Sequence, residues 1–194
     1  MMNPPNPHPG SKSHGRFSSF APILAGATLR ERIIACLGAL ISIALTGLFC
    51  GQLSGDSSYL PMIVAPIGAS AVLLFAVPAS PLAQPWPIIG GNTISALIGV
   101  AVGQVIHDPT LAIGAGVSLA IAAMSFARCL HPPGGAAALT AILAGPAITS
   151  SGFLFPFVPV ALNSLILVAL GICFHKLSGR SYPHVLAPAQ VNTH

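Results

Sequence analysis

A hydrophobic sequence stops and then resumes across Arg128-Cys129-Leu130-His131-Pro132-Pro133-Gly134-Gly135-Ala136-Ala137-Ala138-Leu139-Thr140. Proline suits the first turn of a helix, where its missing N–H would have no partner in any case. The two glycines that follow allow other backbone to approach closely. Arg128 and His131 add polar groups to a chain that has few charges elsewhere. We interpret this segment as a polar break between apolar helices, with a new helix beginning at the prolines.

Composition places the chain in a membrane. Of its 194 residues, 54% are hydrophobic and 5% are charged. Soluble domains carry about 25% charged residues. Uncharged runs cover residues 33–55, 57–107, 109–127 and 129–175, and each has room for at least one spanning helix of about 20 residues. The sequence therefore predicts an all-α, polytopic membrane helix bundle.

Six apolar segments are candidate spans, at about 33–53, 60–77, 88–106, 110–127, 131–147 and 154–175. Pro66 lies inside the second segment, so we expect a break or kink there. The fifth segment would reach only about 25 Å at about 1.5 Å per residue, which is short of a hydrocarbon core of about 30 Å. We therefore expect about six spans that include two short, proline-broken helices, with four or five spans as alternatives.

The charges favour six spans and give them an orientation. With a cytoplasmic N-terminus, six spans put every Lys and Arg inside and put Asp56 and Asp108 outside. This arrangement obeys the positive-inside rule, whereas five spans would move Lys176 and Arg180 outside. The prediction is an inner-membrane protein with a disordered cytoplasmic tail (1–29), a transmembrane domain (30–177) and a loose C-terminal tail (178–194).

The two proline breaks resemble one another. Pro66-Ile67-Gly68-Ala69-Ser70-Ala71-Val72-Leu73 aligns with Pro132-Pro133-Gly134-Gly135-Ala136-Ala137-Ala138-Leu139 at an offset of 66 residues. Each half would then hold three spans, so the second half would enter the membrane inverted. Inverted repeats are a common plan of transporters, in which helix N-termini hold the substrate between the halves. The alternative is a chance alignment of helices that are rich in Ala and Gly.

Residues near the two breaks form a candidate substrate site. Arg128 either attracts an anion or anchors a span at the interface, and His131 either binds an anion or a proton or caps its helix. Small and polar residues are explained by helix packing as readily as by ligand contact. The candidate substrate-binding residues are Arg128, His131, Pro132, Pro133, Gly134, Gly135, Pro66, Gly68, Ser70 and Asn92.

The patterns of common enzymes and metal sites are missing. There is no pair of intramembrane carboxylates, and no H-E-x-x-H, G-x-S-x-G or phosphate-loop pattern. The four cysteines are widely spaced without a C-x-x-C pattern and read as small apolar residues. The basic residues lie at the ends of hydrophobic runs, where membrane topology explains them. We expect no catalytic residue, cofactor, metal or nucleic-acid partner.

Three blocks resemble a known family. Leu130-His131-Pro132-Pro133-Gly134-Gly135-Ala136 is similar to the signature of the HPP family of integral membrane proteins. The segments 65–75 and 80–85 are similar to other blocks of that family, and the resemblance covers about residues 28–177. Gly90-Gly91-Asn92 departs from the Gly-Gly-His of many members, so a histidine-dependent role is not carried over to position 92.

The resemblance implies a function. The family is usually described with four membrane spans, fewer than the charges favour, and its plastid and cyanobacterial members are implicated in nitrite transport. It therefore implies a transporter or channel for a small inorganic anion, with nitrite as the first candidate. A membrane sensor or scaffold subunit that transports nothing is the alternative. The expected partners are the lipid bilayer and the anion, and a homo-oligomer is left open.

Overall fold

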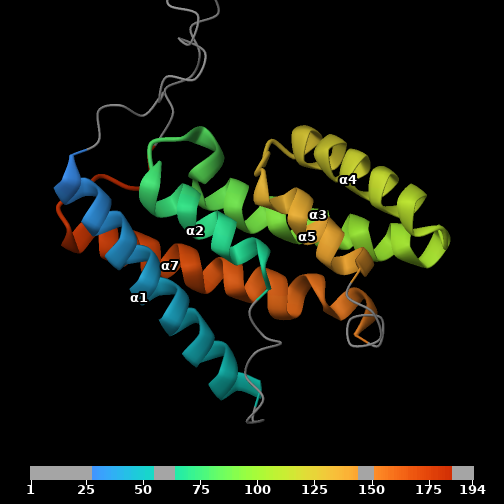
Figure 1. The fold of residues 1–194 in the computed structure, drawn as a ribbon, viewed down its shortest axis with the longest axis horizontal. Helices are drawn as coiled ribbons and strands as arrows, with labels where there is room; N and C mark the ends of the chain where they lie inside the picture. Colours follow the sequence, from blue (N-terminus) through green and yellow to red (C-terminus); the bar gives the residue numbers. More distant parts are fainter. Residues whose placement is uncertain (1–27, 55–63, 144–150, 185–194) are drawn as a thin grey trace, which may run out of the picture.

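The structure is a computed structural model that describes residues 28–54, 64–143 and 151–184. These residues form helices without any strand, as the sequence predicts (Figure 1). The main helices are α1 (Leu29–Ser54), α2 (Pro66–Ala76), α3 (Pro85–Val105), α4 (Pro109–Phe126), α5 (Pro133–Leu143) and α7 (Leu162–Leu177). Shorter elements are the 3₁₀ turns η3 (Pro81–Ala83) and η4 (Gly152–Leu154) and the π-helical η5 (Pro156–Ala161).

Proline begins four of the main helices, at Pro66, Pro85, Pro109 and Pro133. Its fixed φ is already helical, and its missing N–H would be unpaired at a helix start. Pro66 therefore starts α2, which agrees with the break predicted at this proline inside a longer candidate span. Residues 55–63, where that span was expected to begin, lie outside the described chain. Asp108 caps α4 by accepting a hydrogen bond from the N–H of Leu111 at 2.8 Å.

Four helical segments are long and apolar enough to cross a membrane. They are Leu29–Gln52, Pro85–Val105, Pro109–Phe126 and Gly152–Leu177. In contrast, α2 and α5 have 11 residues each. A helix of that length extends about 16 Å, or roughly half of a hydrocarbon core of about 30 Å. The described part of this multi-pass protein thus combines four full-length spans with the two short helices that the sequence predicts.

Successive main helices reverse direction, so their ends gather on two sides of the molecule (Figure 1). On one side, the indole N–H of Trp86 in α3 donates to the carbonyl of Ala127 after α4 at 3.1 Å. The Tyr182 hydroxyl, which follows α7, donates to the Ala83 carbonyl at 2.8 Å. We call this side the basic end, because the described Lys and Arg residues belong to the start of α1 and to the ends of α4 and α7: Arg30, Arg32, Arg128, Lys176 and Arg180.

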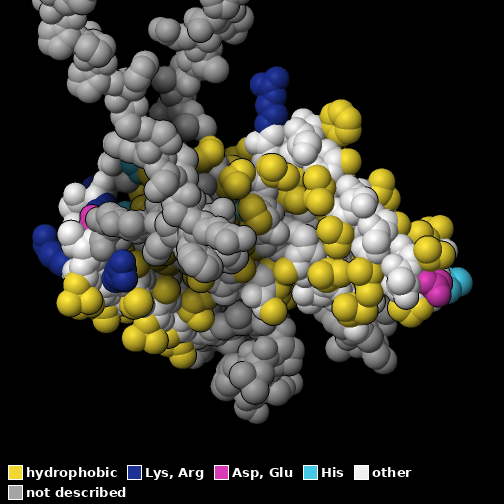
Figure 2. All heavy atoms as spheres, turned by 45° about the horizontal axis from the view of Figure 1, so that its top comes forward, with side chains coloured by type: hydrophobic (Ala, Val, Ile, Leu, Met, Phe, Trp, Pro, Cys, Tyr) yellow, Lys and Arg dark blue, Asp and Glu magenta, His cyan; other side chains and the backbone are white. Residues whose placement is uncertain are grey.

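The surface agrees with this division. Figure 2 shows hydrophobic side chains spread over the face between basic side chains, which have one acidic group beside them, and a second acidic group next to a histidine at the right edge of the view. Asp108 lies between α3 and α4, away from the basic end.

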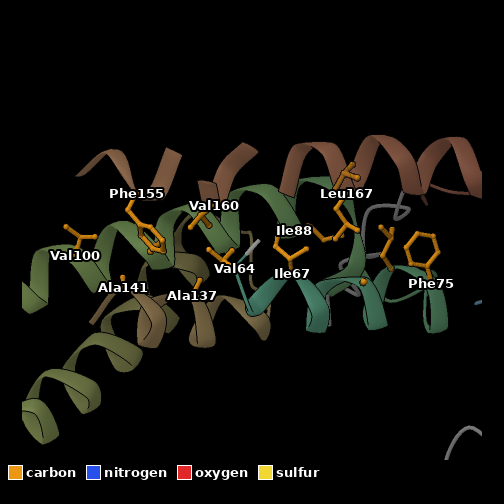
Figure 3. Packing of buried hydrophobic residues seen from close by; sticks show 14 of the residues in the cluster. Val64, Ile67, Phe75, Ile88, Val100, Ala137, Ala141, Phe155, Val160 and Leu167 are labelled. Atoms are coloured by element: carbon orange, nitrogen blue, oxygen red, sulfur yellow. The ribbon is translucent and has the colours of Figure 1, made fainter. Parts of the chain in front are cut away.

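The two short helices begin close together and run apart. Figure 3 shows Ala141 and Ala137 of α5, then Val64, then Ile67 and Phe75 of α2, in that order across the buried core. Because α5 begins at Pro133 and α2 begins two residues after Val64, both N-terminal ends face the middle of the molecule. Each short helix therefore occupies one half of the bundle.

Helix packing is consistent with an inverted repeat. If α1, α2 and α3 exchange with α4, α5 and α7, the packed pair α1–α2 maps onto α4–α5, α1–α7 onto α4–α3, and α2–α7 onto α5–α3. The first turn of α2 closes with backbone hydrogen bonds from Ile67 and Gly68, and that of α5 closes with the same bonds from Gly134 and Gly135. These pairs are 67 residues apart, so the structural register differs by one residue from the predicted offset.

The chain after α7 packs against the basic end. Tyr182 is buried, and the backbone N–H of His184 donates to Gln84 Oε1 at 2.8 Å. The prediction of a loose tail therefore needs correction for residues 178–184, because these hydrogen bonds hold the segment on the bundle. Residues 185–194, and nearly all of the predicted N-terminal tail, lie outside the described chain.

Candidate functional site

Four buried side chains form a connected polar chain inside the bundle. Ser70 of α2, Asn92 of α3, His131 before α5 and Ser164 of α7 are all 0% exposed. Asn92 Nδ2 donates to Ser70 Oγ at 3.0 Å and to Ser164 Oγ at 3.1 Å. Ser70 Oγ lies 2.8 Å from His131 Nε2. We call these four residues the polar chain; it links both halves of the molecule near the starts of the short helices.

The ring of His131 has a defined tautomer. Its Nδ1 lies 2.8 Å from the carbonyl oxygen of Leu82 in η3. Because a carbonyl oxygen only accepts, Nδ1 carries a proton, and in the neutral ring Nε2 is the acceptor that faces Ser70. A Cβ on Gly91 would lie 2.6 Å from His131 Cβ and 2.7 Å from the Cys129 carbonyl oxygen, so glycine at this position leaves room for the segment.

A pocket of about 540 Å³ opens at the basic end, and its lining includes Leu82, whose carbonyl oxygen bonds His131 of the polar chain. Its polar lining consists of Arg128, Gln84, Ser125 and His184, and the lining includes no acidic residue. The guanidinium of Arg128 offers five N–H donors in a planar arrangement that suits anionic oxygens. We call this space the Arg128 pocket.

Arg128 has an unusual backbone conformation. It follows α4 with a φ of 53°, the left-handed region. Its N–H bonds the Ser125 carbonyl and the next N–H, of Cys129, bonds the Met124 carbonyl, which together form a Schellman motif. Glycine normally fills this position, because an L side chain costs about 1–2 kcal/mol there. A simple membrane anchor needs no such conformation, so the geometry favours a role for the Arg128 side chain.

Backbone donors at the short helices are already in use. The N–H of Gly134 donates to the His131 carbonyl at 2.8 Å, and that of Gly135 donates to the Pro132 carbonyl at 3.1 Å. The matching groups of α2 are engaged in the same way. The first turn of each short helix therefore closes on itself, and these glycine N–H groups already have backbone partners in this structure.

The structure separates the ten predicted residues into groups. His131, Ser70 and Asn92 meet in the polar chain, whereas Arg128 lines the pocket nearby. Gly134 packs against α3, because a Cβ there would lie 2.7 Å from Ser95 Oγ. Pro66 is buried at the start of α2, and its carbonyl oxygen lies 3.1 Å from Ser70 Oγ. The remaining predicted residues form no side-chain hydrogen bond with the polar chain among the described residues: Pro133 is buried at a helix start, Pro132 and Gly68 are exposed, and Gly135 is half-buried.

Three contributors were not predicted as site residues. Ser164 Oγ accepts the hydrogen bond from Asn92 Nδ2 and donates to the Val160 carbonyl oxygen at 2.9 Å. Leu82 supplies a backbone carbonyl, and His184 lines the Arg128 pocket. A serine inside an apolar run is a weak signal, and a carbonyl group has no signal in the sequence at all. Folding alone brings these groups to the site.

The chain is similar to a described protein family and to two transmembrane proteins. Residues 25–183 match the family model described as "HPP, transmembrane region". Two transmembrane proteins of Dictyostelium discoideum are similar: one is 39% identical over 127 residues, which are 63% of this chain and 44% of the relative. The other is 37% identical over 126 residues, 62% of this chain and 40% of the relative. The chain spans less than half the length of these relatives. No solved structure matches.

Proposed function

This chain belongs to the HPP transmembrane family, and we propose that it moves a small inorganic anion across the membrane, with nitrite as the first candidate. The observation that carries the proposal is the placement of Arg128. It stands in a backbone conformation that disfavours side chains, at a pocket lined by Leu82, whose carbonyl oxygen bonds His131 of the polar chain. The proposal includes no catalytic step.

The lining of the Arg128 pocket suits an anion. It combines one guanidinium with amide, hydroxyl and imidazole groups and has no carboxylate that would repel negative charge. Its volume of about 540 Å³ exceeds that of a three-atom anion many times over, since one water occupies about 30 Å³. A small anion would therefore enter the pocket with part of its hydration shell.

The interior beyond Leu82 offers a polar route. Non-helical backbone inside a membrane protein is tolerated where it is buried in protein or lines a cavity, and Cys129 and His131 are buried in such a segment. The positive ends of the α2 and α5 dipoles face the same region and favour negative charge there. By the positive-inside rule we place the basic end, and with it the pocket, in the cytoplasm of an inner membrane.

Liposome uptake tests this function. Purified protein is reconstituted, and initial rates of nitrite and nitrate uptake are measured at pH 8 against empty liposomes, which correct for diffusion of the neutral acid. Arg128→Gln should lower the protein-dependent rate at least about tenfold, because a hydrogen bond to a charged group contributes about 1.5–3 kcal/mol. Arg32→Gln is the matched control, since Arg32 is exposed at the same end but does not line the pocket.

Two outcomes would contradict the proposal. Equal losses in the Arg128 and Arg32 variants would show that general surface charge, and not the pocket, sets the rate. No protein-dependent flux of either anion would favour a sensor or scaffold subunit, and a partner recovered in fixed stoichiometry from the native membrane would then support that alternative.

A further inference from the structure

We propose that His131 binds a proton that is transported together with the anion, and that Ser70 is the partner whose hydroxyl reorients when the proton binds. This inference rests on the anion transport proposed above. It adds the coupling ion and names the group that holds it.

The Ser70 hydroxyl has one proton and two acceptors within reach. Its Oγ lies 2.8 Å from His131 Nε2 and 3.1 Å from the Pro66 carbonyl oxygen, while Asn92 Nδ2 donates to it at 3.0 Å. With a neutral ring, the hydroxyl donates to Nε2 and leaves the Pro66 contact. With a protonated ring, Nε2–H donates to Ser70 Oγ and the hydroxyl donates to Pro66, so that all three contacts are satisfied together.

The step balances without any other reactant. An incoming proton binds the lone pair of Nε2, and the ring gains one positive charge. The Ser70 O–H group rotates and its bond does not break, and the Nδ1 proton stays on the ring, where it keeps its hydrogen bond to the Leu82 carbonyl oxygen. Release of the proton restores the first arrangement. The heavy atoms keep their positions, and only the direction of the Ser70 hydroxyl changes between the two states.

The surroundings of His131 link the proton to the anion. Its described neighbours are uncharged: Ser70 and Asn92 from α2 and α3, Gly91 of α3, Ser164 of α7, and the Leu82 carbonyl. The nearest groups that carry or change charge are Cys129 in the same segment, Arg128 and His184 in the pocket, and Tyr182 on the neighbouring Ala83. None of these is a carboxylate.

A buried imidazolium without a counter-charge is unfavourable. An anion that moves in from the Arg128 pocket supplies that counter-charge, so anion binding favours proton binding. Thermodynamic linkage makes the effect reciprocal, since a bound proton must raise the affinity for the anion by the same factor. Proton and anion then move together as a neutral pair.

A second buried histidine provides the contrast. His175 is also 0% exposed, and its Nε2 lies 2.9 Å from the Leu74 carbonyl. Its ring stacks on Phe75, and its Nδ1 has no hydrogen-bond partner among the described residues. It therefore lacks a hydroxyl that could switch direction, and His175→Gln is a matched control for His131→Gln.

Proton uptake on anion binding is the direct test. Sodium nitrite is added to the full chain in weakly buffered detergent at pH 7 with an indicator dye, and binding is measured in parallel by calorimetry. The native protein should take up about one proton per bound anion in the pH range where the free protein is deprotonated and the anion complex is protonated, and in that range its anion affinity should fall about tenfold for each pH unit. His131→Gln should abolish the proton uptake, whereas the control variants His175→Gln and Ser95→Ala should retain it. Ser95 is a suitable control because it is buried and has no hydrogen-bond partner among the described residues.

The outcomes separate the two proposals. No nitrite or nitrate binding by the native protein contradicts the transport function itself. Binding without proton uptake, or full uptake in His131→Gln, overturns the inference and leaves transport in place. If His131→Gln does not fold, two other measurements test the inference. Proton uptake should fall at least twofold in Ser70→Ala. An anion affinity of the native protein that does not change with pH overturns the inference.

Discussion

The short helices α2 and α5 begin with the same hydrogen-bonded turn but pack in different ways. α5 touches α3 backbone to backbone: a Cβ on Gly99 would lie 2.5 Å from the Ala138 carbonyl oxygen. α2 touches α7 through a side chain, because a Cβ on Gly171 would meet Leu74 Cδ2 at 2.5 Å. Backbone contacts cannot adjust, whereas a leucine end can rotate. The difference teaches that α5, which carries His131 at its entrance, is the fixed member of the pair and α2 the adjustable one.

The largest expected effect comes from adding one methyl group to each interface, at Gly99 and at Gly171. Gly99→Ala should destabilise the protein by about 3 kcal/mol, because the new atom collides with backbone and with Ala138 Cα at 2.9 Å. Gly171→Ala should cost about 1 kcal/mol, since Leu74 can move. Thermal unfolding in detergent gives both values. Equal losses would mean that the two short helices are held with equal rigidity.

The entrance to α5 provides the second test. Both α4 and α7 end in Schellman motifs. The left-handed position is occupied by Arg128 after α4, with φ 53°, and by Gly179 after α7, with φ 69°. Arg128→Gly should stabilise the protein by about 1 kcal/mol and reduce anion uptake, while Gly179→Ala should destabilise it by about 1 kcal/mol. An Arg128→Gly variant with native stability and native uptake would show that neither strain nor charge matters at this site.

The smallest expected effect tests whether α2 and α5 match at equivalent positions. Gly68 and Gly135 are 67 residues apart at matching positions, and a Cβ on either would meet nothing within 4 Å. Each change to alanine should therefore stabilise the protein by about 0.5 kcal/mol through helix propensity. Paired unfolding measurements check the match, and opposite signs at the two positions would contradict the repeat.

The helices were predictable because hydropathy and proline both act locally. α3 begins at Pro85 and not near residue 88, and α4 begins at Pro109, within one residue of the predicted start. The last span was predicted as one helix but bends at Val158, with φ −129° and ψ 106°, before Pro159. A hydropathy average extends over many residues, so it does not register the backbone angles of a single one.

The site was predictable only in part. His131, Ser70 and Asn92 were expected as separate candidates, and the structure connects them into one chain with Ser164. Which groups meet depends on how α2, α3 and α7 cross, and this information is spread over residues far apart in the sequence. The Leu82 carbonyl could come from any residue type, so no sequence pattern marks it.

The hydrogen bond from Trp86 to Ala127 gives the molecule a natural optical reporter. The chain contains one tryptophan, so all of its indole fluorescence arises where the start of α3 meets the end of α4, one residue from Arg128. An event that separates these helix ends would break the bond and change the surroundings of the indole, which changes its emission. Opening at the basic end could thus be followed in real time without any attached dye.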